Sequence, residues 1–600
     1  MAAPPPPPNN PLCHDIRPGF AFMYAAMSFV VGAQSLADDN LRETLPKLQE
    51  ADTMMAAAKD DDWVGTRAFR GGTHVMIGVM KLGNGEYVGG AWSVWQAWRK
   101  LKSIKEEQLL EYQGIEGVVV RSVSLFMLGA LQLFGSLMRP LMPRLFGGEK
   151  GKALQMLHQC VEEDGLCATN AAHLLVEWFL GGVQQLRFEP FTARELALCD
   201  KLLERCETKY PDSLYASIPR IHHLMRRGET KAALVHSQET FAHPVVASKL
   251  SHQMMRAQLQ SKCLFVLMQW KEAGDVVQAS IDRFIAEQRY SLVPSLAALA
   301  SWFYWASGDV ARGPELKALV ASIELAQRAR KFHRADKRIW QEGRRQMELI
   351  DEAASGGGTP PKQAALLEMI TVHLSKGAGV QMSPESTESI LELLEAEETT
   401  GPCASDSEWV AHSTLCRAEF HMSQAEASVL RDDLPTAGSS GSDEAGGVRG
   451  SESDAGSEPW KGFEAGKNEA RSRRLKRLEA ALELCAKARK LLQPPPSGWG
   501  SLGSLFAGGT GRAKSKGLLA HCLFIESCAL LYKGSLVGVS SQRAVWIMAL
   551  DAAKQSAAQG TSKELPGVVL RLRLPLLKNR IQVLLDDHSQ QVLPGAAVSI

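Results

Sequence analysis

The residues whose spacing best suggests chemistry form a glycine-rich run, Gly508-Gly509-Thr510-Gly511-Arg512-Ala513-Lys514-Ser515. The run differs by one residue from a phosphate-binding P-loop, because Ala513 stands where the second conserved glycine of that motif belongs. A phosphate site also needs a strand before the loop and a helix after it, so that backbone N–H groups converge on the anion. Proline, glycine and serine precede this run instead. This context favours a linker over a nucleotide site.

Histidines suggest two metal sites. His222 and His223 are adjacent, and His173 lies four residues before Glu177. Neither pair has the His-Glu-x-x-His spacing or an evident third ligand, so we expect structural or solvent-exposed histidines. The sequence therefore predicts no metal, no other cofactor and no catalytic residue, and we do not expect an enzyme.

The eleven cysteines include no Cys-x-x-Cys pair. Cys199 and Cys206 are spaced to share one face of a helix, as buried apolar residues do. We expect reduced, structural thiols, which favour a cytoplasmic protein, with the nucleus as an alternative.

Composition is that of a globular protein with almost no net charge. Of 600 residues, 45% are hydrophobic, and 67 basic side chains nearly balance 66 acidic ones. Near-zero net charge gives no electrostatic reason to expect a nucleic-acid partner. A chain of this length exceeds what one core usually serves, so we expect several packing units.

Apolar residues recur with a helical period almost throughout the chain, which predicts an all-α fold. Three helix–turn–helix units align on turns at Gly228, Gln269 and Gly308, which lie about 40 residues apart, as in helical-hairpin repeats. A small residue lies five positions after each turn and a large one four positions before it: Ala233, Gly274 and Gly313, and Leu224, Phe265 and Tyr304. Tetratricopeptide (TPR) repeats share this pattern, because the small residue lets two helices approach closely. We expect an α-solenoid of divergent TPR-like helical hairpins with a long disordered insertion; chance agreement among alanine-rich helices is the alternative.

Composition shifts divide the chain. The centre of the insertion, 436–458, has almost no apolar residue to offset the entropy of ordering. The expected parts are a disordered Pro-rich tail (1–19), an N-terminal helical region with an apolar central helix (20–190), TPR-like helical repeats (191–354), a helical continuation (355–398), an acidic Gly/Ser-rich disordered linker (399–468), an amphipathic helix (469–493), a Gly/Pro-rich loop (494–516) and a C-terminal helical repeat (517–588).

Two segments are candidates for membrane contact. Val118–Met138 is long enough to span a bilayer, but Arg121 and Gln132 interrupt it, and the central helix of a large helical protein has the same composition. The basic run 471–477 opens an amphipathic helix. We interpret this helix as a solvated face, with membrane-surface contact or a nuclear signal as alternatives.

Several short motifs resemble the tetratricopeptide repeat protein 39 family, which includes the fungal inclusion body clearance proteins. The first is Leu128–Pro140 followed by Phe146-Gly147-Gly148; it is similar to the family's apolar helix, Ser-Leu-Leu-Pro-type turn and Gly-Phe-x-Gly turn. Met138-Arg139 replaces the second leucine, and Phe146 precedes both glycines. The further matches, in the same order as in the family, are Phe29 with Asp38 and Asp39, Trp270-Lys271-Glu272-Ala273, and Glu526–Gly534 with Ala544–Ala553.

The resemblance extends over residues 20–350 and 515–590. It implies a helical repeat scaffold or adaptor that binds proteins, is cytosolic or peripherally membrane-associated, and has a link to clearance of aggregated proteins or to lipid homeostasis. A peripheral protein of a lipid surface, either the cytosolic face of the mitochondrial outer membrane or lipid droplets, is the alternative. The resemblance supplies no catalytic residue.

Candidate protein-binding residues lie on the first helix of each hairpin, which lines the concave face in arrays of this type. Counting back from the turns gives His222, Arg226, Arg256, Trp302 and Trp305. Aromatic and arginine side chains supply much of the binding energy at protein interfaces. Trp302 and Trp305 have an alternative role, because they are spaced to pack under the neighbouring repeat.

Overall fold

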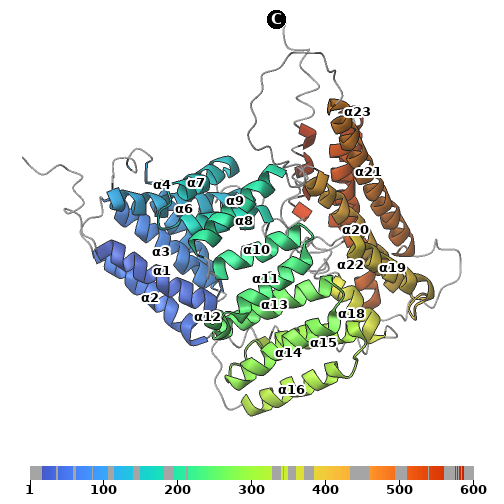
Figure 1. The fold of residues 1–600 in the computed structure, drawn as a ribbon, viewed down its shortest axis with the longest axis horizontal. Coiled ribbons are helices and arrows are strands. Elements are labelled where there is room, and N and C mark those ends of the chain that lie inside the picture. The colour runs from blue at the N-terminus through green and yellow to red at the C-terminus, as the bar shows by residue number, and fades with distance from the viewer. Residues whose placement is uncertain are drawn as a thin grey trace, which may run out of the picture. The chain divides into compact units, whose positions relative to one another are not determined.

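The computed structural model builds the chain from α-helices (Figure 1). It describes residues 17–35, 38–57, 63–83, 86–105, 108, 114–138, 149–180, 193–210, 214–327, 340–341, 343–348, 360–370, 384–432, 459–492, 510–537, 539–559 and separate positions within 574–586. No strand occurs in these ranges, which confirms the predicted all-α class.

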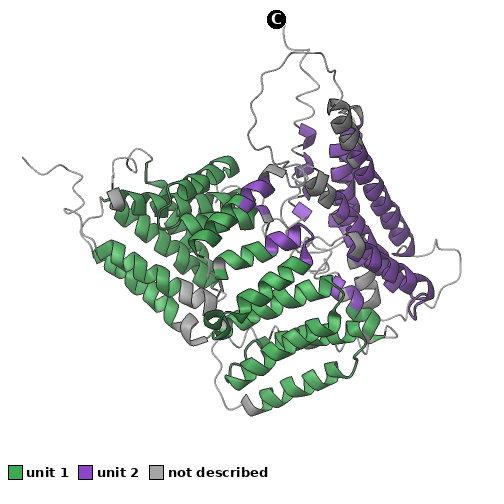
Figure 2. Cartoon of the chain, in the orientation of Figure 1, with its two compact units in different colours: residues 1–178, 201–221, 231–365 green, residues 179–200, 222–230, 366–600 purple. Residues whose placement is uncertain are grey.

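Contacts divide the chain into two compact units, drawn in green and purple in Figure 2. Unit 1 comprises residues 1–178, 201–221 and 231–365, and unit 2 comprises residues 179–200, 222–230 and 366–600. More than one packing unit is what 600 residues require.

The first half of unit 1 is a set of packed helices. They are α1 (Arg17–Ser35), α2 (Asp38–Ala57), α3 (Val64–Gly83), α4 (Tyr87–Lys102), α6 (Gly114–Met138), α7 (Lys150–Glu162) and α8 (Ala168–Leu180). Helix α3 packs against α1, α2, α4 and α6, and α6 packs against α7. Helix α3 therefore lies at the centre of this group.

Helix α6 contains the apolar central segment predicted from sequence. Within the described part of the chain, 117–136 is the one stretch long and apolar enough to cross a membrane, and more than half of it is buried. Its Arg121 pairs with Glu163 at 3.1 Å. Gly129 lies so close to α7 that an added Cβ would stand 3.0 Å from Leu157 Cγ. This packing explains why the buried face of α6 is apolar.

The second half of unit 1 continues as helical hairpins. Its helices, some of which extend into unit 2, are α9 (Ala193–Lys209), α10 (Leu214–Arg226), α11 (Thr230–Ala242), α12 (Pro244–Ala247), α13 (Leu250–Val266), α14 (Trp270–Ala286), α15 (Val293–Ser307) and α16 (Arg312–Gln327). Helices α13, α14, α15 and α16 each pack against the next. This order of contacts is that of a TPR-like solenoid, as predicted.

The turns of three hairpins repeat with one backbone geometry. Gly228, Met268 and Gly308 all have positive φ and lie 40 residues apart. In each turn the following N–H donates to the carbonyl five residues earlier, with donors Glu229, Gln269 and Asp309. This is the Schellman motif, which satisfies carbonyls at the end of a helix.

The predicted turn residue Gln269 is therefore wrong by one position, because Met268 takes the left-handed conformation. Methionine is unusual there, since a Cβ makes that conformation costly. Only the packed hairpin can hold it, which is why residue type did not reveal the turn. The corrected repeat places Leu264 and Ala273 where Phe265 and Gly274 were predicted.

Glycines and aromatic rings fix the spacing between these helices. An added Cβ on Gly274 would lie 2.8 Å from Cε1 of Tyr304, so the Tyr304 ring rests directly on α14. The Tyr304 hydroxyl donates to Asp275 at 2.9 Å. Burial is the main reason that the pKa of Tyr304 is raised, and the hydroxyl therefore stays a donor. Gly313 is covered in the same way by Trp305.

Unit 2 is formed mainly by the C-terminal helices. They are α19 (Pro384–Thr400), α20 (Ser407–Asp432), α21 (Pro459–Leu492), α22 (Thr510–Leu536) and α23 (Val539–Gln559), with α18 (Pro361–Ile370) at the boundary. Helix α20 packs along α21, α21 along α22, and α22 along α23. One core cluster joins α20, α21 and α22, and another joins α22 and α23 to helical residues after 573.

Three predicted boundaries in this unit are wrong. The linker predicted for 399–468 does not begin at residue 399, because α20 occupies Ser407–Asp432 and buries Leu415 and Ala418 against α21. Helix α21 already begins at Pro459 and α22 at Thr510, inside the predicted linker and the 494–516 loop. The Gly/Ser-rich residues that follow dominated the composition of the predicted segment and obscured the apolar helical stripe of 399–432. The predicted disorder of 436–458 concerns residues outside the described ranges.

Candidate functional site

Trp305 and Trp302 were both predicted to lie on the binding face, and the structure separates them. Trp305 is 4% exposed, and its indole Nε1 donates to the carbonyl of Val310 at 3.2 Å. The ring covers Gly313 within the same hairpin. Trp305 therefore does not lie on an open surface and has a packing role, which the sequence left as the alternative. Trp302 meets Trp305 edge-on, with 5.9 Å between ring centroids, and is itself only half-buried.

Arg226 is also buried, so its predicted place on an open surface is wrong. His222 is half-buried. Its neighbour His223 is fully buried, with Nε2 2.7 Å from Asp200. Asp200 also accepts a hydrogen bond from Arg227 at 3.3 Å. His223 is thus a structural histidine, and no metal-binding group of three His, Cys, Asp or Glu occurs in the described ranges.

The 40-residue repeat places Lys262, and not the predicted Arg256, at the position equivalent to His222 and Trp302. Measured from the turns at Gly228, Met268 and Gly308, one repeat position holds His222, Lys262 and Trp302. All three are half-buried. Arg256 is also half-buried and donates to Gln260 at 3.1 Å, but it occupies a different repeat position. Arg256 lies 12 residues before its turn, whereas His222 and Trp302 lie six before theirs; exact 40-residue spacing gives Lys262.

The open side of α15 is narrow. From Val293 to Ala306 the residues that are not fully buried are Ser295, Leu299 and Trp302. They lie four and then three positions apart, so they form one stripe along the helix. Whatever contacts α15 from solvent must therefore contact this stripe, where Trp302 is the largest side chain.

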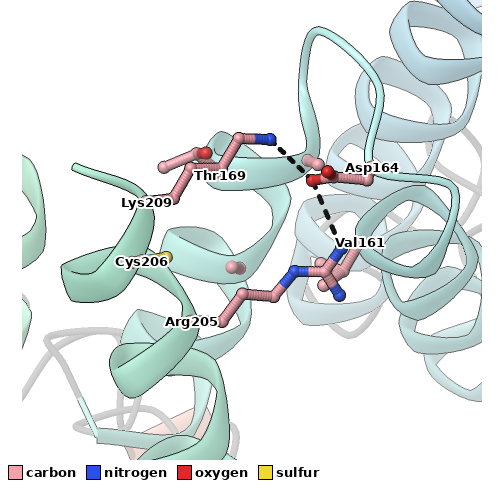
Figure 3. Close-up of a pocket in the computed structure, with 8 residues that line it drawn as sticks. Val161, Asp164, Thr169, Arg205, Cys206 and Lys209 are labelled. Atoms are coloured by element: carbon pink, nitrogen blue, oxygen red, sulfur yellow. Dashed lines mark hydrogen bonds and ion pairs between the residues drawn. The ribbon is translucent and has the colours of Figure 1, made fainter.

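A small cavity lies beside the turn between α7 and α8, and Figure 3 shows its lining. Asp164 has positive φ in this turn and accepts ion pairs from Lys209 at 2.7 Å and Arg205 at 3.2 Å. The hydrogen bond from Lys209 is the main cause that lowers the pKa of Asp164. The cavity volume is about 10 Å³, room for about one water molecule. We interpret this group as a tie between the turn and α9, because no substrate fits.

The cysteines and the glycine-rich run are the remaining candidates for reactive or phosphate-binding groups. Ten cysteines in the described ranges are free and buried. Burial raises the pKa of Cys160 to about 11 and that of Cys167 to about 12, so both stay neutral thiols. Residues 510–515 of the P-loop-like run already lie in α22, whereas Gly508 and Gly509 lie outside the described ranges. In a P-loop the backbone of this run would form a loop before the helix. The described residues 510–515 are instead already helical, so they do not form a phosphate-binding loop.

The helices from α4 to most of α14 can be compared with known families. Residues 85–283 match the family model described as Iml2/Tetratricopeptide repeat protein 39. Over this segment, about a third of the chain, the protein is similar to the Iml2/tetratricopeptide repeat protein 39 family. The matched residues include the capped turns at Gly228 and Met268. The predicted resemblance is therefore confirmed for the segment that contains these two hairpins. A comparison with curated proteins gave no match.

Proposed function

We propose that the protein is a non-catalytic scaffold that binds other proteins through the partly open side of its first repeat helices. The observation that carries this proposal is the repeat position shared by His222, Lys262 and Trp302. The backbone around this position is the same in three hairpins, whereas the side chain changes from imidazole to ammonium to indole. Constant packing with variable half-buried positions is typical of repeat proteins that recognise partners.

Trp302 is the proposed anchor of the part of this surface in unit 1, to which Lys262 and Trp302 both belong. Its indole is large, and T-shaped contact with the buried Trp305 holds it in place. A side chain fixed before binding loses little conformational entropy in the complex. Lys262 adds a positive charge at the equivalent point of α13, which favours partners with acidic side chains.

Partner capture by proximity labelling in cells tests this function. Two variants, Trp302→Ala and Lys262→Glu, are compared with controls on the second helices of the hairpins. Leu325→Ala changes an apolar side chain that is 67% exposed on α16, and Lys271→Glu reverses an exposed charge on α14. Loss of the same partners in the first pair alone supports the proposal. Unchanged partners in both folded variants contradict it.

The family relationship supports a narrower proposal about the process. We propose that the scaffold works in the cytoplasm, in clearance of aggregated proteins or in lipid homeostasis. Cells that lack the protein should then accumulate a fluorescent aggregation reporter or altered lipid droplets. Wild-type protein should restore both, and Trp302→Ala should not. Normal reporters in the deleted cells would refute this narrower proposal and leave the scaffold function standing.

A further inference from the structure

Helix α4 exposes a stripe of aromatic and basic side chains. Val88, Trp92, Trp95, Arg99 and Lys102 follow one another at intervals of four and three residues, so they share one helix face. Val88 is 87% exposed and Trp92 is 56% exposed. Exposed aromatic clusters of this kind mark interaction sites on soluble domains.

Glycines hold α4 in place and set which face is outward. An added Cβ on Gly78 of α3 would lie 3.2 Å from the carbonyl oxygen of Gly90 on α4. An added Cβ on Gly90 would lie 2.6 Å from Cγ of Leu82. The two backbones thus approach closely on one side of α4, and the aromatic stripe points away from it.

The charges along α4 have one sign. Helix α4 contains no carboxylate, and its last turn contains Arg99, Lys100 and Lys102. The guanidinium of Arg99 lies 4.9 Å from the Trp95 ring centroid, and the ammonium of Lys102 lies 5.9 Å from that of Trp98. The cations therefore lie at the same surface as the rings. A negatively charged group above the stripe would contact both the cations and the rings.

We propose that this stripe of α4 docks on the surface of a phospholipid bilayer that contains anionic headgroups. Tryptophan and tyrosine favour the boundary between headgroups and acyl chains, because one part of each ring is apolar and another forms hydrogen bonds. Arginine and lysine extend from such a face to lipid phosphates. An exposed stripe that carries cations and no carboxylate fits a broad anionic surface. The proposal is independent of the repeat surface around Trp302.

Vesicle flotation of the full-length protein tests the proposal. One vesicle is an equal mixture of phosphatidylcholine and phosphatidylserine, and the other is phosphatidylcholine alone. We expect flotation with the anionic vesicle only, and release by high salt, since salt screens surface charge. Trp92→Glu should abolish flotation. The double variant Arg99→Glu with Lys102→Glu should lower partitioning at least about tenfold, because each basic residue near an anionic surface contributes strongly.

Two controls separate this face from others in unit 1. Phe20→Glu places a charge on another exposed aromatic position, which is 69% exposed on α1. The double variant Lys231→Glu with Lys271→Glu makes the same change of net charge on exposed positions of α11 and α14. Both should float like the wild type.

Four results would overturn the proposal: no flotation, equal flotation with uncharged vesicles, unchanged flotation of the α4 variants, or an equal loss in the controls. A fall in molecular mass of Trp92→Glu by light scattering, with unchanged flotation, would instead assign the stripe to contact with a second copy.

Discussion

The contact between Tyr304 and Gly274 predicts that Gly274→Ala lowers stability when the Tyr304 ring is present and raises it when the ring is absent. Alanine at position 274 would gain about 1 kcal/mol of helix stability over glycine. Its Cβ would, however, lie 2.8 Å from Tyr304 Cε1, well inside the optimal carbon–carbon separation of about 3.5 Å or more. Overpacking of this kind costs about 1–3 kcal/mol. We therefore expect Gly274→Ala to destabilise α14 and α15 by about 1 kcal/mol net.

Removal of the ring should reverse this effect. Tyr304→Ala alone should be strongly destabilising, by about 3–5 kcal/mol, because it empties a fully buried aromatic site. In that background Gly274→Ala meets no ring, so only the helix gain of about 1 kcal/mol remains. The coupling between the two changes should thus be about 1–3 kcal/mol, as expected for residues in contact.

Native-state hydrogen exchange by mass spectrometry is the suitable assay, because a chain with two units does not unfold as one cooperative whole. A change of 1 kcal/mol alters the local opening equilibrium about fivefold. Gly151→Ala in α7 is the matched control, since nothing lies within 4 Å of an added Cβ there, and it should stabilise α7. Equal stabilisation by Gly274→Ala with and without Tyr304 would refute the reasoning.

Three further predictions concern turns, protons and thiols. Met268→Gly should slow exchange at the end of α13, because glycine removes a left-handed strain of about 1 kcal/mol, and Gly308→Ala should speed exchange at the end of α15. Burial first, and then Arg477, lower the pKa of His421 to about 4. The unfolded chain therefore binds the extra proton between that value and the ordinary 6.5, so unit 2 should lose stability as pH falls through this window, and His421→Gln should reduce the loss in pH-dependent unfolding. The ten buried thiols should resist alkylation in native protein and react after denaturation, as measured by intact mass.

The helical class and the hairpin repeat were predictable because both depend on local patterns. Apolar residues at helical spacing specify which face of a helix is buried, whatever it packs against. The turns at Gly228 and Gly308 were visible because glycine tolerates positive φ. The turn at Met268 was not, since methionine rarely takes positive φ and the hydrogen bonds that define the turn run between backbone groups.

The linker boundary failed for a different reason. Residues 399–432 contain seven charged side chains, no more than the chain average, but they were averaged with the Gly/Ser-rich stretch 433–458, whose composition resembles that of a disordered chain. Yet Glu398 is buried and bonded to Ser413, Arg417 and Lys487, all at 3.0 Å. A charged residue satisfied by distant partners belongs to a folded unit, and only the three-dimensional arrangement shows those partners.

The exposure of the candidate residues was only partly predictable. Counting from the turns named His222 and Trp302, which are both half-buried in the structure. It could not tell that Trp305, three residues further, turns inward over Gly313. Tryptophan suits both buried packing and binding surfaces, so exposure decides between them.

Site-specific photo-cross-linking tests the central claim, protein binding by the first repeat helices, most directly. A photo-reactive amino acid is placed in living cells either at position 262 on α13 or at position 271 on α14. We predict cross-linked protein partners from position 262 and none from position 271, because only the first position lies on the partly open side of a first helix. Partners cross-linked from position 271, with none from 262, would contradict the account.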